Sequence, residues 1–125
     1  RNINQKRKDV MKANELRIGN YTEQGKINSF WEGGICLKYG KSFKFSELNP
    51  IPLTEDILLK CGIEIDGSFG HIKHFESIYL LKPWIEADHF LLKTIGGECI
   101  SKIKHLHQLQ NLYFALTNGE LKIEL

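Results

Sequence analysis

The hydrophobic pattern is clearest near the C-terminus, in residues 103–119. Apolar side chains recur there every three or four positions, a spacing that gathers them on one stripe of an α-helix: Ile103, Leu106, Leu109, Leu112, Tyr113 and Leu116. The positions between them predict a polar, solvent-facing side: Lys104, His105, His107, Gln108, Gln110 and Asn111. Asn118 and Gly119 tolerate positive φ, so the helix should end there. We expect this amphipathic helix to pack across a sheet.

Residues 11–53 show a different pattern, because glycine turns recur in them every eight to ten positions. A single helical turn is expected at 12–16, and four short strands follow it: 17–22, 26–31, 35–39 and 42–46. Ile35, Leu37 and Tyr39 would share one face of a strand, and Phe43 and Phe45 would share one face of the next. One buried and one solvated face is typical of an antiparallel meander.

Four short strands closed by the segment 47–52 resemble a small SH3-like antiparallel β-barrel. The second half begins after Pro50 and Pro52. Thr54 is a good N-cap, so a helix is expected at 54–60, with its stop at Gly62. Five strands are expected after it: 63–65, 69–72, 76–81, 90–94 and 98–101.

The predicted fold class is α+β: an SH3-like barrel, a helix, an antiparallel β-meander and a C-terminal amphipathic helix. Three parts follow, namely a basic tail at 1–10, an SH3-like subdomain at 11–53 and a helix–meander–helix subdomain at 54–125. The pattern leaves open whether the two subdomains share one core.

Composition and charge bear on the kind of protein and on its possible binding partners. With 125 residues, 42% hydrophobic and 26% charged, the chain resembles an ordinary globular protein. Its formal charge is +2, but the tail alone carries +3, from Arg1, Lys6, Arg7 and Lys8 against Asp9. The other 115 residues therefore carry −1, the difference between +2 and +3. Because these 115 residues together are close to neutral, a large nucleic-acid-binding face is not expected on them. The tail at 1–10 is either a simple extension or a basic arm.

Several features predict a cytoplasmic protein. Cys36, Cys61 and Cys99 are odd in number and lack C-x-x-C spacing, which favours free thiols buried as small apolar side chains. No apolar run is long enough to cross a membrane, and residues 1–10 lack the apolar centre of a signal peptide.

The sequence contains no pattern that predicts an active site. It lacks a phosphate-binding glycine loop, a nucleophile elbow and an H-E-x-x-H helix. His105 and His107 on one helix would point about 200° apart, and His71 and His74 would lie on opposite faces of a strand. The loop 86–89 holds two carboxylates and an imidazole, yet a solvated connection is the better interpretation. We therefore predict no enzyme, no metal and no cofactor.

The candidate binding residues are lysines and aromatics of the first half: Trp31, Lys38, Tyr39, Lys41 and Lys44. Lysines beside aromatics can form a surface for single-stranded nucleic acid. Alternation explains them more simply, as outward lysines on strands whose aromatics point inward.

Three stretches of the sequence also carry a family resemblance: residues 12–21 (KANELRIGNY), 50–60 (PIPLTEDILLK) and 103–117, which contains HQLQNLYFALT. Together they resemble a group of small uncharacterised proteins encoded by gut Bacteroidetes bacteria and by their phages and mobile elements. The resemblance spans the start, middle and end of residues 11–125. It implies a bacterial or phage cytoplasmic setting and transfers no catalytic residue.

The leading functional prediction is a non-enzymatic binding module for an unknown protein partner, with no membrane association. In a mobile-element setting, the partner would be a host component. The first alternative is a nucleic-acid-binding accessory protein that uses the basic tail and the surface of Lys38, Lys41 and Lys44, with Trp31 exposed. The second is a small-ligand or nucleotide-binding protein with a pocket between the two halves.

Overall fold

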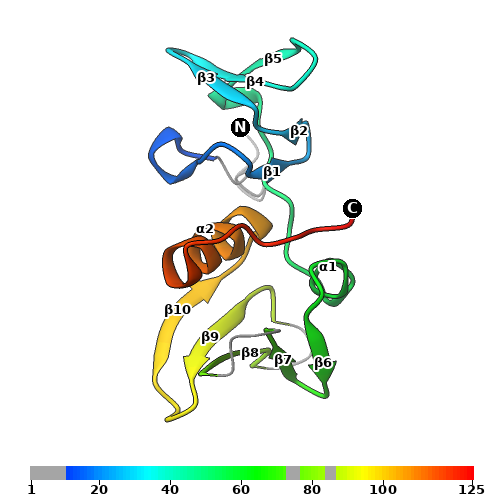
Figure 1. Ribbon diagram of the computed structural model, residues 1–125, viewed down its shortest axis with the longest axis vertical. Coiled ribbons are helices and arrows are strands. Elements are labelled where there is room, and N and C mark those ends of the chain that lie inside the picture. Colours follow the sequence, from blue (N-terminus) through cyan, green and yellow to red (C-terminus); the bar gives the residue numbers. More distant parts are fainter. Residues whose placement is uncertain (1–10, 73–76, 84–86) are drawn as a thin grey trace, which may run out of the picture. The chain divides into compact units, whose positions relative to one another are not determined.

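The computed structural model describes residues 11–72, 77–83 and 87–125. It shows a mixed α+β protein with several antiparallel sheets and a C-terminal helix, as the sequence predicts (Figure 1). The chain divides after Ile51 into two compact units, hereafter unit 1 and unit 2. The division lies in the proline-rich segment, two residues before the predicted boundary at 53.

Unit 1 contains two small antiparallel sheets. Strands β1 (Tyr21–Thr22) and β2 (Gly25–Lys26) form one sheet. The other has the order β3–β4–β5, from Ser29–Trp31, Gly34–Cys36 and Ser42–Lys44. Short 3₁₀ turns lie before β1 and after β5, at η1 (Ala13–Glu15) and η2 (Phe45–Glu47).

The two sheets of unit 1 do not close into a barrel. The segment after η2, which was expected to close one, is not a strand. Hydrogen bonds hold it at the β1–β2 turn instead: the Glu23 N–H donates to the Asn49 carbonyl (2.9 Å), and the Asn49 N–H donates to Gln24 Oε1 (2.8 Å). Strands of two or three residues are too short to carry hydrogen bonding continuously from one sheet into the other.

The core of unit 1 is small and is made of Met11, Ile27, Ile35 and Leu48. Partly buried apolar side chains surround it: Leu16, Leu37, Phe43 and Phe45. The register places Ile35 directly between Phe30 and Phe43, so this row of side chains forms the inner face of the three-stranded sheet. Gly34 is required beside it, because a Cβ there would collide with the backbone carbonyl of Phe43.

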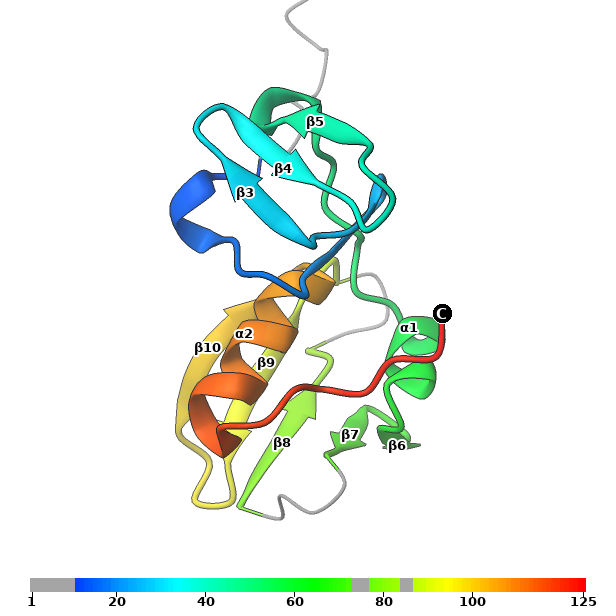
Figure 2. The ribbon, with the colours of Figure 1, turned by 45° about the horizontal axis from the view of Figure 1, so that its top comes forward.

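Unit 2 is a five-stranded antiparallel meander with two helices. Helix α1 (Glu55–Lys60) precedes five strands that pair in the order β10–β9–β8–β7–β6. In chain order these are β6 (Glu64–Asp66), β7 (Phe69–His71), β8 (Ile78–Leu81), β9 (Phe90–Thr94) and β10 (Cys99–Ile103). All five predicted strands are found within two residues of their predicted ends, and helix α2 (Leu106–Thr117) follows. In Figures 1 and 2, α2 lies along β9 and β10.

Local signals in the sequence explain the start of unit 2. Thr54 caps α1, since its hydroxyl oxygen accepts from the Ile57 N–H at 3.2 Å. Gly62 follows the helix at φ +76°, and Gly67 forms the β6–β7 turn at φ +62°; both values favour glycine. The predicted cap at Thr54 and the predicted stop at Gly62 are confirmed.

The core of unit 2 follows from strict alternation in β8 and β9. Ile78 and Leu80 are buried on β8, and Phe90 and Leu92 are buried on β9. Ile103, Leu106 and Leu109 add to this core from β10 and α2. The residues between them face the other side of the sheet and are partly exposed.

The predicted faces of the terminal helix are wrong in part. Ile103 belongs to β10, and α2 begins at Leu106. His107 and Gln110, expected in solvent, are 1% and 2% exposed, whereas Leu116 is 40% exposed. The first turns are enclosed over a wide arc that includes positions 106, 107, 109 and 110, and the last turn is open. The predicted end is confirmed, because Asn118 adopts the left-handed conformation at φ 58°.

Candidate functional site

The five predicted binding residues separate into two groups at opposite ends of the β3–β4–β5 sheet. Trp31 and Lys44 lie at the end where β4 begins, each paired with Gly34 in the strand register. Lys38, Tyr39 and Lys41 lie at the other end, in the turn that joins β4 to β5. The sheet therefore carries two separate pairings of aromatic and basic side chains.

At the first end, the Trp31 side chain lies against the β3–β4 turn. Its indole Nε1–H donates to the Ile35 carbonyl at 3.3 Å, and a Cβ at Gly33 would fall 2.5 Å from the indole ring. Trp31 is nevertheless 44% exposed. Since directly paired residues of adjacent strands share a face, Trp31 and Lys44 project from the outer face of the sheet. Cys36 and Ser42 share that face, with 3.1 Å between Sγ and Oγ.

At the second end, a tight turn displays Tyr39. The Leu37 N–H donates to the Lys41 carbonyl at 2.7 Å, and Gly40 turns the chain at φ +86°. Tyr39 is 91% exposed. The alternation that placed it beside Ile35 and Leu37 therefore fails, because β4 ends at Cys36 and the turn re-aims the chain.

The lysines of this turn lie close to aromatic rings. Lys38 Nζ is 5.7 Å from the centroid of the Tyr39 ring, and Lys41 Nζ is 5.8 Å from that of Phe43. Both distances are within the range of cation–π attraction. The turn therefore exposes the Tyr39 phenol between the ammonium groups of Lys38 and Lys41. This arrangement suits an acidic partner surface with a recess for an aromatic ring.

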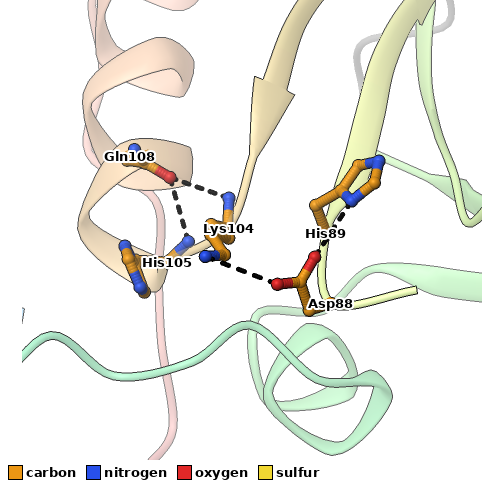
Figure 3. A network of polar contacts seen from close by, with 5 residues as sticks. All are labelled: Asp88, His89, Lys104, His105 and Gln108. Carbon is orange, nitrogen blue, oxygen red and sulfur yellow. Dashed lines mark hydrogen bonds and ion pairs between the residues drawn. The ribbon is translucent and has the colours of Figure 1, made fainter. Parts of the chain in front are cut away.

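Unit 2 holds a polar network where β10 passes into α2 (Figure 3). The Gln108 side-chain oxygen accepts from the backbone N–H groups of Lys104 (2.7 Å) and His105 (3.0 Å), which secures the start of the helix. The Asp88 carboxylate lies 3.2 Å from His89 Nδ1 and 3.4 Å from Lys104 Nζ. The hydrogen bond from His89, then that from Lys104, hold the pKa of Asp88 below its usual value.

The network gives Asp88 of the acidic loop a structural role. Asp88 joins the segment before β9 to the end of β10. Sequence reasoning missed the Asp88–Lys104 pair, since 16 positions separate the two residues and no local pattern connects them. A glutamine three residues after a helix start is a known capping signal, and it identifies Gln108 in retrospect.

The structure corrects one of the two predictions about pairs of histidines. His105 lies outside α2, as its N-cap, so the two imidazoles of His105 and His107 do not diverge as predicted. Their rings stack with centroids 5.7 Å apart and planes inclined by 11°. His74 and Glu86 fall outside the described residues. Within residues 11–72, 77–83 and 87–125, no group of three or more His, Cys, Asp or Glu side chains is placed to hold a metal ion.

The three cysteines are free, as predicted, but only Cys61 is buried. Burial raises the pKa of the Cys61 thiol to about 11, so it is neutral at physiological pH. Cys36 is half-buried on the outer sheet face, and Cys99 is exposed on the edge strand β10. The prediction of three buried thiols is therefore wrong for two of them, because apolar sequence neighbours say little about which face of a strand a residue takes.

Two hollows are lined by residues of unit 2. One, of about 200 Å³, lies between α1 and the sheet. The other, of about 470 Å³, runs along the C-terminal segment, whose Glu124 N–H donates to the Lys60 carbonyl at 2.9 Å. Figure 2 shows this segment beside α1. Neither was anticipated from the sequence.

Among the described helices, none is long and apolar enough to cross a membrane. Comparisons with protein-family models, with curated proteins and with solved structures found no match to this chain.

Proposed function

We propose that this chain is a non-enzymatic binding module that engages a protein partner through unit 1. The observation that carries the proposal is the Tyr39 side chain, 91% exposed between Lys38 and Lys41. Tyrosine and tryptophan are enriched among the residues that dominate interface energies. A tyrosine this exposed contributes little to folding, and most of its surface is available to a partner.

The charges around Tyr39 define the kind of partner surface. Lys38, Lys41 and Lys44 are all exposed, and they stand out on a body whose net charge is near zero. Such a local positive surface steers an acidic partner and sets its orientation. The partner is therefore an acidic protein surface with a recess for the Tyr39 ring, and Trp31 with Lys44 offers a second anchor at the other end of the sheet.

The biological setting rests on the resemblance to proteins of gut Bacteroidetes and their phages and mobile elements. We expect a cytoplasmic protein that acts on a host component. Small antiparallel sheets of the SH3-like kind commonly present binding surfaces on their loops. The proposal itself stands on the exposed side chains of unit 1.

The test is a paired affinity purification from nuclease-treated lysate of a Bacteroidetes host. Wild type, Tyr39→Ser and Ile18→Ser would be immobilised in parallel; Ile18 is a matched control, 56% exposed in the same unit. We expect one dominant partner on wild type and on Ile18→Ser, and its loss on Tyr39→Ser. Equal capture by Tyr39→Ser would exclude this surface as the binding site.

The alternative function, nucleic-acid binding, is favoured by one observation: two lysines, Lys38 and Lys41, lie beside aromatic rings at the β4–β5 end of the sheet. Bases stack on exposed aromatics, and lysines contact phosphates. Binding of single-stranded DNA would then appear at low salt and weaken steeply as salt rises. Absence of any complex at about 50 mM salt, where such contacts are strong, would remove this alternative.

A further inference from the structure

The smaller hollow of unit 2 is lined by more apolar than polar surface. Leu58 of α1, Ile65 of β6 and Phe90 of β9 contribute its apolar walls. Gly70 of β7 also lines it, paired in the sheet with Ile65 and with the buried Leu80. Gly70 adds no side chain of its own, and Ile63 Cγ2 lies 3.2 Å from the place where its Cβ would be, with Leu80 beside it. Figure 2 shows α1 beside β6 and β7, the elements that border the space.

The size of the hollow limits what it can hold. Its volume is about 200 Å³, and an apolar cavity of about 150 Å³ holds one benzene molecule. A branched aliphatic chain or a single six-membered ring therefore fits, whereas a nucleotide is too large to be enclosed.

Two opposite charges lie at the rim of this apolar space. Glu55 lines it from the first turn of α1, and Lys82 lines it from the end of β8. Lys82 Nζ lies 5.8 Å from the centroid of the Phe90 ring, which holds the ammonium group over the apolar wall. Within the described part of unit 2, no ion pair joins Glu55 to Lys82. The carboxylate and the ammonium therefore do not neutralise each other.

We propose that this hollow binds a small zwitterion with an apolar body, namely an α-amino acid of the size of leucine or phenylalanine. The apolar side chain lies against Leu58, Ile65 and Phe90, the ligand carboxylate faces Lys82 and the ligand ammonium faces Glu55. This site lies wholly in unit 2 and does not depend on the protein-binding role proposed for unit 1.

The test is a titration followed by methyl NMR, with L-leucine as the probe, up to about 20 mM, well above a Kd of about 1 mM. We expect shifts centred on the methyl groups of Leu58 and Ile65. Two analogues test the two charged contacts one at a time: 4-methylpentanoate lacks the ammonium group, and 3-methylbutylamine lacks the carboxylate. Each should bind about tenfold more weakly, because it leaves one charged contact unmade.

Variants of the rim complete the experiment. Lys82→Gln and Glu55→Gln should each raise the Kd for leucine about tenfold, whereas Lys102→Gln and Glu98→Gln, exposed changes on β10 and just before it, should leave it unchanged. Glu55 is exposed, so its variant keeps the test valid if Lys82→Gln alters the fold. Absence of leucine-dependent shifts at Leu58 and Ile65, or equal binding of the two analogues and leucine, would overturn the proposal.

Discussion

The two units differ in the size of their cores and in the exposure of their aromatic side chains. Unit 2 aligns strands of three to five residues, so that alternation buries one face and α2 covers it. Unit 1 has strands of two or three residues around four buried apolar side chains, and it leaves Phe30, Trp31 and Tyr39 at 40%, 44% and 91% exposure. Unit 2 also exposes aliphatic side chains, such as Ile95 at 69%, but among its described aromatic residues the large exposed one is Phe69, at 45%. The comparison teaches that longer, aligned strands cover their aromatic side chains more fully than the short strands of unit 1.

The largest effect should come from the centre of the unit 2 core. Leu109 is 1% exposed, so Leu109→Ala should lower the free energy of unfolding by about 2–5 kcal/mol, through lost burial and the cavity left behind. Leu116 is a matched control on the same helix at 40% exposure, and its change to Ala should cost about 0.5 kcal/mol or less. Urea unfolding would measure both, and equal losses would show that α2 is not anchored by its first turns.

A smaller effect is expected in unit 1 from Gly34→Ala. The new Cβ would meet the Phe43 carbonyl and the Lys44 Cα, which are backbone atoms that cannot rotate away. Overpacking of this kind costs about 1–3 kcal/mol. In amide NMR spectra, the signals of β3, β4 and β5 should move or broaden while those of β8 and β9 stay in place. Gly96→Ala is the control, since its Cβ meets Thr94 Oγ1 at an ordinary 3.7 Å; disturbance by both variants would contradict the steric explanation.

Prediction from the sequence succeeds where the signals are local. The start of unit 2 follows from local signals, such as the Thr54 cap and the helix stop at Gly62. Each of these acts within a few residues, so one sequence is enough to find it. The need for glycine at position 34 comes from β5, ten residues away, and is invisible without the strand register.

Prediction from the sequence fails where long-range contacts or backbone geometry decide which way a side chain points. His107 and Gln110 look solvated by residue type, but the arc of α2 that becomes enclosed depends on how the helix is placed. Tyr39 looks inward by alternation, but the strand ends three residues before it. The strand register separates the five candidate binding residues between two ends of one sheet, and the sequence alone does not show this separation.

The thiols give a more modest test of burial. At neutral pH, Cys99 should react first with iodoacetamide and Cys61 last, because Cys99 is exposed and Cys61 is a neutral buried thiol. The pKa of Cys61 is about 11 in the folded protein against 9.0 for an unperturbed thiol. The unfolded chain therefore loses this proton first, and the associated stability should be lost between pH 9.0 and about 11. Peptide mass spectrometry after timed labelling would report the order, and fast labelling of Cys61 would contradict its burial.

The smallest effect on folding, and the largest on binding, is expected at Tyr39. The most direct measurement is the Kd of the purified partner for wild type and for Tyr39→Ser, with urea unfolding of both proteins. Unfolding free energies should agree within about 0.5 kcal/mol, while the Kd rises at least about 30-fold, the equivalent of a hot-spot loss of about 2 kcal/mol. An unchanged Kd with an intact fold would contradict the claim that unit 1 binds through this side chain.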